Sequence, residues 1–431
     1  MRSRFTGLWR HPDFIRLWIG QSISQFGSHI GGGALQFTAI LILGAMPFQI
    51  SLLMAAQIAP ALVVGLPAGV WADRLRRRPI LIACDIGRAV LLLSIPVAYL
   101  LDVLSFVQLY LVAAAVGALT ICFDVTYQAF LPSVVRRDEL VEGNSKLGLS
   151  DSLAEIAGPP LGGILVQIIS APLVIALDAL SFLLSGLSIG RIQAREPAGA
   201  LSRRKSSVWR EAQEGMGATW RNSLLRVLLI VALVRNVSGG IIGALYSLYL
   251  IRDLGLAPAL VGLSIGVGGL AALLGALMVG PVVARWGVGP AIGGALAISG
   301  VAALLIPLAH GPAWMALAMI FVAQSSDMAY AVYSIAGLSL RQSVTAERLL
   351  GRVNASFGFL TAGAGLIGAL IGGALGELVG LRAALALGAL GSASACLWVY
   401  FSPLRGLRRA PEPDGPHPVA AGIAGGYGES A

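Results

Sequence analysis

Charged side chains are scarce in this chain, which has 21 Asp and Glu and 30 Lys and Arg among 431 residues. They make up 12% of the sequence, whereas soluble domains have roughly 25%. Hydrophobic residues reach 57%, and the mean hydropathy is +0.82. This composition excludes an ordinary soluble domain and predicts an all-α protein that crosses a membrane several times.

Other residue types are also rare. The three cysteines all fall in apolar runs, which argues against a disulfide framework. The four histidines are scattered, so we expect no enzyme, no metal site and no cofactor. Neither Lys146 nor Lys205 fits a G-x-x-x-x-G-K-[ST] motif, so a nucleotide is not an expected partner. The net charge of +9 is spread over many short loops, which favours membrane lipids over nucleic acid as the partner.

Long apolar runs are abundant. A helix needs ~20 apolar residues to cross a bilayer, and twelve runs of about that length are separated by charges, prolines or glycines. We expect the spans at 16–43, 48–71, 79–101, 105–130, 146–170, 172–190, 224–251, 257–283, 289–309, 312–339, 352–376 and 380–401.

The basic residues predict the orientation. If the N-terminus lies inside, the inner segments and their flanks hold all Lys and Arg except Arg235, which lies in a span, and Arg252 and Arg382, which lie outside. Positively charged short loops stay on the cytoplasmic side. We therefore expect both termini in the cytoplasm and the protein in the plasma membrane.

The second half of the chain repeats the first. At an offset of 211 residues Gly69, Arg74 and Pro79 meet Gly280, Arg285 and Pro290; at 210, Asn144, Gly148, Gly158, Gly162 and Gly163 meet Asn354, Gly358, Gly368, Gly372 and Gly373. Repeated glycines and prolines predict a repeated backbone. We expect an amphipathic lead-in at 1–15, six-helix halves at 16–190 and 223–402, a cytoplasmic linker at 191–222 with a surface helix from Val208 to Trp220, and a disordered cytoplasmic tail at 403–431.

The basic turn GVWADRLRRRP at 69–79 contains the pattern G-x-x-x-D-R-x-x-R-R. With the twelve spans in two halves, this turn resembles the major facilitator superfamily over residues 10–402. The runs LWIGQSISQFGSHI and GNSKLGLSDSLAEIAGPPLGG resemble its bacterial drug-efflux and siderophore-export branch. The resemblance implies a first-loop motif at Gly69, Asp73, Arg74, Arg77 and Arg78, and an antiporter motif at Gly158, Pro159, Gly162 and Gly163.

The loop motif has two readings. Asp73 can lie at the N-terminus of the helix after Arg348, where the helix dipole favours an anion, and Arg74 can pair with Asp124. Both contacts would hold the inner side shut. Alternatively, the arginines only fix the topology.

The antiporter motif also has two interpretations. Gly158 and Gly162, four apart, permit close helix packing, either for an antiporter role or as part of generic tight packing. Many proton-coupled drug exporters have an arginine in the fourth span, but LVAAAVGALTICFDVTYQAF has none. Proton coupling would then require Asp124, Glu155 or Asp327.

Ionisable residues in mid-membrane are functional candidates. Asp327 is central in the tenth span and shares a helix face with Gln324 and Tyr330, whereas Arg235 is central in the seventh, with Tyr246 on its face. We expect all five to line the substrate cavity. An Arg235–Asp327 pair is either a fixed buried pair or a site where Asp327 exchanges a proton.

The first span has a polar stripe of Gln21, Gln25, His29 and Gln36, which we expect to face the same cavity. His29 either titrates or forms an ordinary hydrogen bond. Four apart on the fifth span, Asp151 and Glu155 are further proton-relay candidates. Asp178, on the peripheral sixth span, is expected to bond a neighbouring helix.

The sequence thus predicts a secondary exporter of the major facilitator type. It would move an amphiphilic small molecule outward in exchange for protons by alternating access. A drug, a siderophore and a secondary metabolite would each fit this description of the substrate. A non-transporting sensor or assembly protein, or an uncoupled facilitator, is the alternative.

Overall fold

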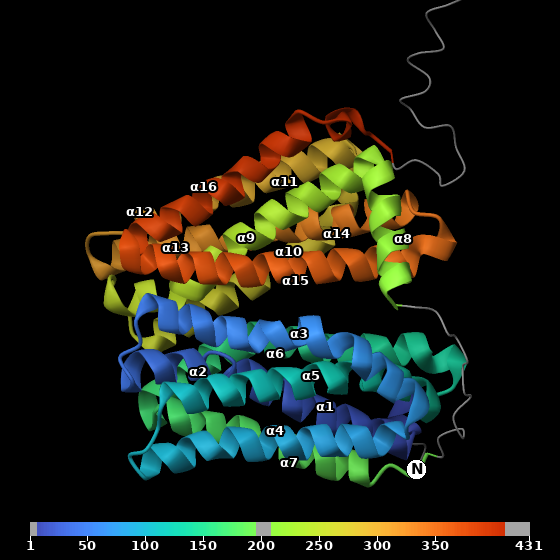
Figure 1. Ribbon diagram of the computed structural model, residues 1–431, viewed down its shortest axis with the longest axis vertical. Coiled ribbons are helices and arrows are strands. Elements are labelled where there is room, and N and C mark those ends of the chain that lie inside the picture. Colours follow the sequence, from blue (N-terminus) through green and yellow to red (C-terminus); the bar gives the residue numbers. More distant parts are fainter. Residues whose placement is uncertain (1–6, 195–207, 410–431) are drawn as a thin grey trace, which may run out of the picture.

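A computed structural model describes residues 7–194 and 208–409, all as helices and short connections. Figure 1 shows two bundles, α1 to α7 and α9 to α16, with α3 and α15 side by side between them. The crossing helices of the first bundle are α1 (Pro12–Gly31), α3 (Pro47–Arg74), α4 (Arg77–Leu100), α5 (Phe106–Val134), α6 (Leu140–Ile169) and α7 (Ala171–Gly190).

The second bundle begins after α8 (Val208–Arg221), in the segment where a surface helix was expected. Its helices are α9 (Ser223–Arg252), α10 (Pro258–Trp286), α11 (Val288–Ala303) with the short α12 (Leu305–Leu308), α13 (Ala313–Ser325), α14 (Asp327–Ser343), α15 (Glu347–Leu378) and α16 (Leu381–Tyr400).

The described residues form twelve crossing segments, as predicted, although three of them are interrupted. The ninth is interrupted at Leu304, between α11 and α12. Eleven segments of the described chain are long and apolar enough to cross a membrane as they stand. The remaining one is the first, where α1 is followed by α2 (Ala34–Phe37) and a π-helix (Thr38–Ile42) after a break at Gly32 and Gly33. The tenth segment is broken at Ser326, between α13 and α14.

Helix packing reproduces the sequence repeat. In the first half α1 packs on α6 and α7, α5 on α3 and α4, and α4 on α7. In the second half α9 packs on α15 and α16, the α13–α14 segment on α10 and α11, and α11 on α16. Even an unusual backbone angle recurs, since Ser170 and Gly380, 210 residues apart, have φ values of 86° and 87°. The predicted pair of six-helix pseudo-repeats is confirmed.

The two halves touch along α6 with α10 and along α3 with α15. A Cβ added to Gly163 of α6 would lie 2.3 Å from the carbonyl oxygen of Pro258, and one added to Gly262 would lie 2.1 Å from that of Pro159. A Cβ on Gly373 of α15 would lie 2.4 Å from Ser51 Oγ. Glycines therefore allow backbone contact at both places.

These contacts lie near one end of the two helix bundles, which we call the far side. The N-termini of α3, α10 and α16 lie at this end. The opposite, basic side contains the turn from α3 to α4. Toward the basic side the α15 residues Gly351 and Gly358 have nothing within 4 Å of an added Cβ, as is true of Gly148 on α6. Among the described residues, the close glycine contacts between the halves therefore lie at the far side, whereas these three glycines toward the basic side face open space.

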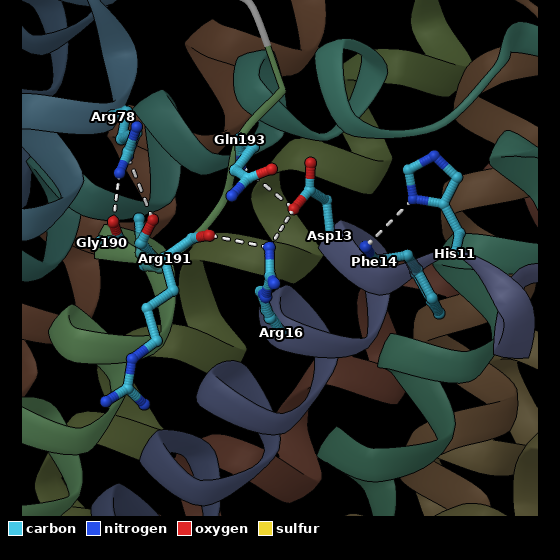
Figure 2. A network of polar contacts seen from close by, with 9 residues as sticks. His11, Asp13, Phe14, Arg16, Arg78, Gly190, Arg191 and Gln193 are labelled. Atoms are coloured by element: carbon cyan, nitrogen blue, oxygen red, sulfur yellow. Dashed lines mark hydrogen bonds and ion pairs between the residues drawn. The ribbon is translucent and has the colours of Figure 1, made fainter.

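Polar contacts tie the first half together on the basic side (Figure 2). The Arg78 guanidinium donates to the carbonyls of Ile189 and Gly190 at the C-terminus of α7, where the helix dipole favours a cation. Arg16 bonds Asp13 and the carbonyl of Arg191 at 2.8 Å each. The ends of α1, α4 and α7 are fixed to one another.

The second half has a different support. Helix α8 packs on α15, where Arg352 of α15 forms an ion pair with Glu214. An added Cβ on Gly215 would lie 2.5 Å from the carbonyl oxygen of Arg352. The linker helix thus belongs to the second bundle.

Candidate functional site

A cavity of about 350 Å³ lies among α2, α9, α10, α11, α12, α13, α14 and α16. Apolar walls come from Ile242, Ile265 and Ile306. Five of the nine predicted cavity residues line it, namely Gln36, Arg235, Tyr246, Gln324 and Asp327. Among these lining residues only Gln36 comes from the first half. Four serines, Ser247, Ser299, Ser326 and Ser392, also line it, so nine of the sixteen lining residues are polar. The cavity is thus more polar than a typical small-molecule site, which is mostly apolar with a few polar groups.

Asp327 owes its position to the break in the tenth segment. Residue Ser326 ends α13, and Asp327 becomes the first residue of α14. Ser326 keeps a helical backbone, with φ −71° and ψ −8°, so Asp327 lies at a one-residue irregularity within a span that runs from Ala313 to Ser343. An added Cβ on Gly268 of α10 would lie 2.5 Å from Asp327 Oδ2, so this carboxylate lies close against α10.

Arg235 faces the same cavity but does not form the ion pair that the sequence suggested. Among the described residues it donates a hydrogen bond to the Ser392 hydroxyl of α16, and its guanidinium lies 4.9 Å from the ring centre of Tyr330. Its Nε atom is buried without a hydrogen-bond partner in the described structure. Arg235 and Asp327 are therefore two separate polar points of one cavity.

The other predicted cavity residues lie elsewhere. Tyr330 lies against Arg235 without lining the cavity. Gln25 is half-buried, with its Oε1 unbonded among the described residues. His29 Nε2 lies 3.5 Å from Asp151 Oδ1. Gln21 was expected to face the cavity, but it is 4% exposed and contacts Ser185 of α7. The polar stripe of the first span thus points in several directions.

The proton-relay candidates of the first half occupy the exposed face of α6 and the neighbouring part of α5. Asp151 and Glu155 are both exposed. Asp124 is exposed too, within electrostatic range of Arg88 and Asp151. None of these three carboxylates lines the cavity, so their coupling role stays a prediction.

The loop motif is described only in part. The side chains of Gly69, Asp73 and Arg74 lie outside the described residues, so their predicted latch contacts stay predictions. Arg77 donates to the carbonyl of Ala129 at 2.8 Å, and Arg78 caps α7 as described. Both arginines thus make contacts within their own half.

The antiporter-like motif joins three helices. An added Cβ on Gly158 would lie 2.4 Å from His29 Cβ, and one on Gly162 would lie 2.3 Å from the Ile30 carbonyl oxygen. These two glycines face α1, whereas Pro159 and Gly163 face α10. The motif therefore lies where the first helix, the fifth span and the other half meet.

Sequence analysis missed a buried charge cluster in the first half, which we name the Asp85–Arg88–Asp178 cluster. The exposed fractions of Asp85, Arg88 and Asp178 are 0%, 4% and 8%. Arg88 was counted among the basic flanks of a span, yet it is inside the bundle and pairs with Asp85 at 2.5 Å. The spacing D-x-x-R within the apolar run at 79–101 could have signalled it, because residues three apart share a helix face.

Asp178 was expected to bond a neighbouring helix, and it accepts a hydrogen bond from Ser28 of α1 at 3.3 Å. The Arg88 guanidinium lies between two rings, 4.4 Å from the centre of Phe123 and 4.1 Å from that of Phe182. Such cation–π contacts stabilise a desolvated guanidinium. The cluster joins α1, α4, α5 and α7.

Comparison with known proteins agrees with this architecture. The profile of the Major Facilitator Superfamily matches residues 17–369 and 228–425. Two uncharacterised MFS-type transporters of Bacillus subtilis (strain 168) are similar. YfiS is 28% identical over 267 residues, 61% of this chain and 63% of YfiS, and YkuC is 26% identical over 229 residues, 52% of this chain and 53% of YkuC. The matches thus span between half and two thirds of these relatives.

Solved structures share the fold at low identity. A bacterial homologue of the iron transporter ferroportin in its inward-facing state has a TM-score of 0.73 and 18% identity, covering 92% of this chain and 99% of the other. A bacterial homologue of the lysosomal transporter Spinster, inward-facing and occupied, has a TM-score of 0.70 at 15% identity, covering 92% and 97%.

The same ferroportin homologue in its outward-facing state has a TM-score of 0.56 at 17% identity, covering 90% of this chain and 97% of the other. At these identities the solved structures show that the fold is shared.

Proposed function

Because the chain belongs to the major facilitator superfamily of membrane transporters, we propose that it exports an amphiphilic small molecule across the plasma membrane in exchange for protons. A transporter of this family binds its substrate between two halves and needs no chemical catalysis. The basic side would face the cytoplasm, as the positive-inside rule favours.

One observation carries the proposal, namely the cavity shared by Arg235 and Asp327. Its lining combines three isoleucines with nine polar residues. Such a site suits an amphiphilic molecule that carries several polar groups beside an apolar part. It lies near the break in the tenth segment, away from both faces of the membrane, as an alternating-access site requires.

Asp327 is the proposed coupling residue of this cavity. It is a half-buried carboxylate in the middle of the tenth segment, and no hydrogen bond or ion pair reaches it from the described residues. An acid in that position can bind a proton from the cavity while substrate is absent. Arg235, anchored by Ser392 and Tyr330, would orient the polar group of the substrate.

Flux in proteoliposomes tests the proposal. Cationic dyes, macrolides and siderophores are loaded with and without an imposed pH gradient, and wild type is compared with Asp327→Asn. The matched control is Asp253→Asn, at the exposed end of α9. We expect gradient-driven movement of at least one probe, lost in Asp327→Asn and kept in the control.

Three other outcomes contradict parts of the proposal. Movement that ignores the gradient makes the protein an uncoupled facilitator. Probe binding without any movement favours a sensor. Gradient-driven movement that survives in Asp327→Asn removes this residue from the coupling path.

A further inference from the structure

The Asp85–Arg88–Asp178 cluster has an unbalanced charge. Two carboxyl groups and one guanidinium are buried together in the membrane interior. A buried ion pair is tolerated when its partner is close, and Arg88 pairs directly with Asp85. The second carboxylate would be a net negative charge in a dry environment, which is costly.

No other cation of the described residues balances this charge. The groups that face the cluster are Cys84 on α4, Cys122 and Asp124 on α5, and the hydroxyls of Ser28 on α1 and of Ser181 and Ser185 on α7. Asp124 would add a further negative charge at its edge. Asp85 Oδ2 and Arg88 Nε are buried and have no hydrogen-bond partner in the described structure.

We propose that the Asp85–Arg88–Asp178 cluster is a proton-binding site in which one of the two carboxyl groups holds a proton. The proton brings the cluster to neutrality. A metal cation would also balance the charge, but the Arg88 guanidinium next to both carboxyl groups repels it. This site is separate from the cavity of Arg235 and Asp327, and the inference does not depend on the export proposal.

The site is positioned to act on the first helix. Asp178 faces Gly27 and Gly31 of α1, where added Cβ atoms would lie 3.1 Å from its Oδ1 and 2.9 Å from its Oδ2. Gly31 is the last residue of α1 before the break at Gly32 and Gly33, and Gln36 of the cavity follows the break. Loss of the proton would place a charge against this end of α1 and change its packing. The proton is thereby linked to the first-half wall of the cavity.

Infrared spectroscopy of the full-length purified protein, labelled with ¹³C in its aspartate carboxyl groups, tests the site without a substrate. A protonated carboxyl group has a C=O stretch that a carboxylate lacks. We expect wild type at neutral pH to show this band from the cluster. Asp85→Asn and Asp178→Asn should each lose the same component, because each single variant leaves one carboxylate facing one guanidinium.

Two variants keep the test decisive. Asp253→Asn, outside the bundle core, should leave the band intact. Arg88→Gln leaves two carboxyl groups without a cation, so both should be protonated and the component should about double in intensity. If Arg88→Gln does not fold, the two Asn variants still decide the matter.

Several results overturn the inference. The component is absent from wild type, or it persists in both Asp85→Asn and Asp178→Asn. A third contrary result is loss of the wild-type band when sodium replaces choline, which would identify a metal-cation site instead.

Discussion

The two halves share one backbone but carry their charges in different places. Position 88 of the first half, an arginine, corresponds to Ser299 at the offset of 211, and Asp85 corresponds to Leu296. Conversely, Arg235 of the second half corresponds to Ser24. In the first half Asp85, Arg88 and Asp178 are buried among α1, α4, α5 and α7. In the second half Arg235 and Asp327 face the cavity from α9 and α14.

This difference separates two physical roles. A charge that faces a cavity can exchange partners with water, substrate or a proton, at modest cost to folding. A charge enclosed by helices must be balanced where it lies, because desolvation is severe. The repeat therefore preserves the packing positions, while ionisable groups are placed independently in each half.

The largest expected effect comes from breaking the enclosed cluster. Arg88→Leu removes the guanidinium that the described structure places beside two buried carboxyl groups, and it should lower the free energy of unfolding by about 3–5 kcal/mol. Thermal unfolding in detergent, followed by loss of monodisperse protein, measures it. Arg136→Leu, at an exposed turn, is the control and should unfold like wild type. Equal stability of both variants would show that the cluster is not enclosed.

Arg235, which faces the cavity, should show the opposite pattern, with a larger effect on probe binding than on stability. Arg235→Ala removes hydrogen bonds from a charged group, which are worth about 1.5–3 kcal/mol, so binding of a transported probe should weaken roughly 10- to 100-fold. Stability should fall less than in Arg88→Leu. Titration calorimetry or fluorescence with the probe found in the flux assay measures it. Unchanged affinity together with a large loss of stability would reverse the comparison.

A third prediction concerns the contact between the halves. Gly262→Ala places a methyl group 2.1 Å from the Pro159 carbonyl oxygen, and such overpacking costs about 1–3 kcal/mol. The far-side closure should weaken, so spin labels across the far side should report a larger open population. Gly280→Ala, with nothing within 4 Å, is the control. An unchanged distance distribution in Gly262→Ala would contradict the closure contact.

The smallest expected effect comes from a helix contact that occurs once in each half. Gly27 of α1 meets Ser181 of α7, and the corresponding Ser238 of α9 meets Gly391 of α16, with glycine and serine exchanged. In Gly391→Ala the new methyl group meets only a hydroxyl that can rotate, so stability should fall by less than about 1 kcal/mol.

In Gly27→Ala the methyl group also meets the Asp178 carboxyl, so the loss should reach about 1–3 kcal/mol. Thermal unfolding of both variants side by side measures the difference. Equal losses would mean that Asp178 does not constrain α1.

The fold could be predicted from the sequence to a large extent. Apolar runs, the repeated glycines and the basic turns gave twelve segments in two halves, because membrane insertion depends on local hydropathy and loop charge. The breaks at Gly32 and Ser326 were missed, because a short interruption barely changes the mean hydropathy of a run. Five predicted cavity residues surround one cavity, whereas the helix-face argument misplaced Gln21 because it cannot tell which neighbour a polar face meets.

The sequence by itself determined the membrane class, the doubled six-helix half and the glycine positions where helices can approach. These features are local or periodic, so they can be read along one dimension. Only the tertiary structure decided that Arg88 is enclosed, that Arg235 bonds Ser392 rather than Asp327, and that the halves close at the far side. Each of these depends on which side chains from distant helices exclude water from the same volume.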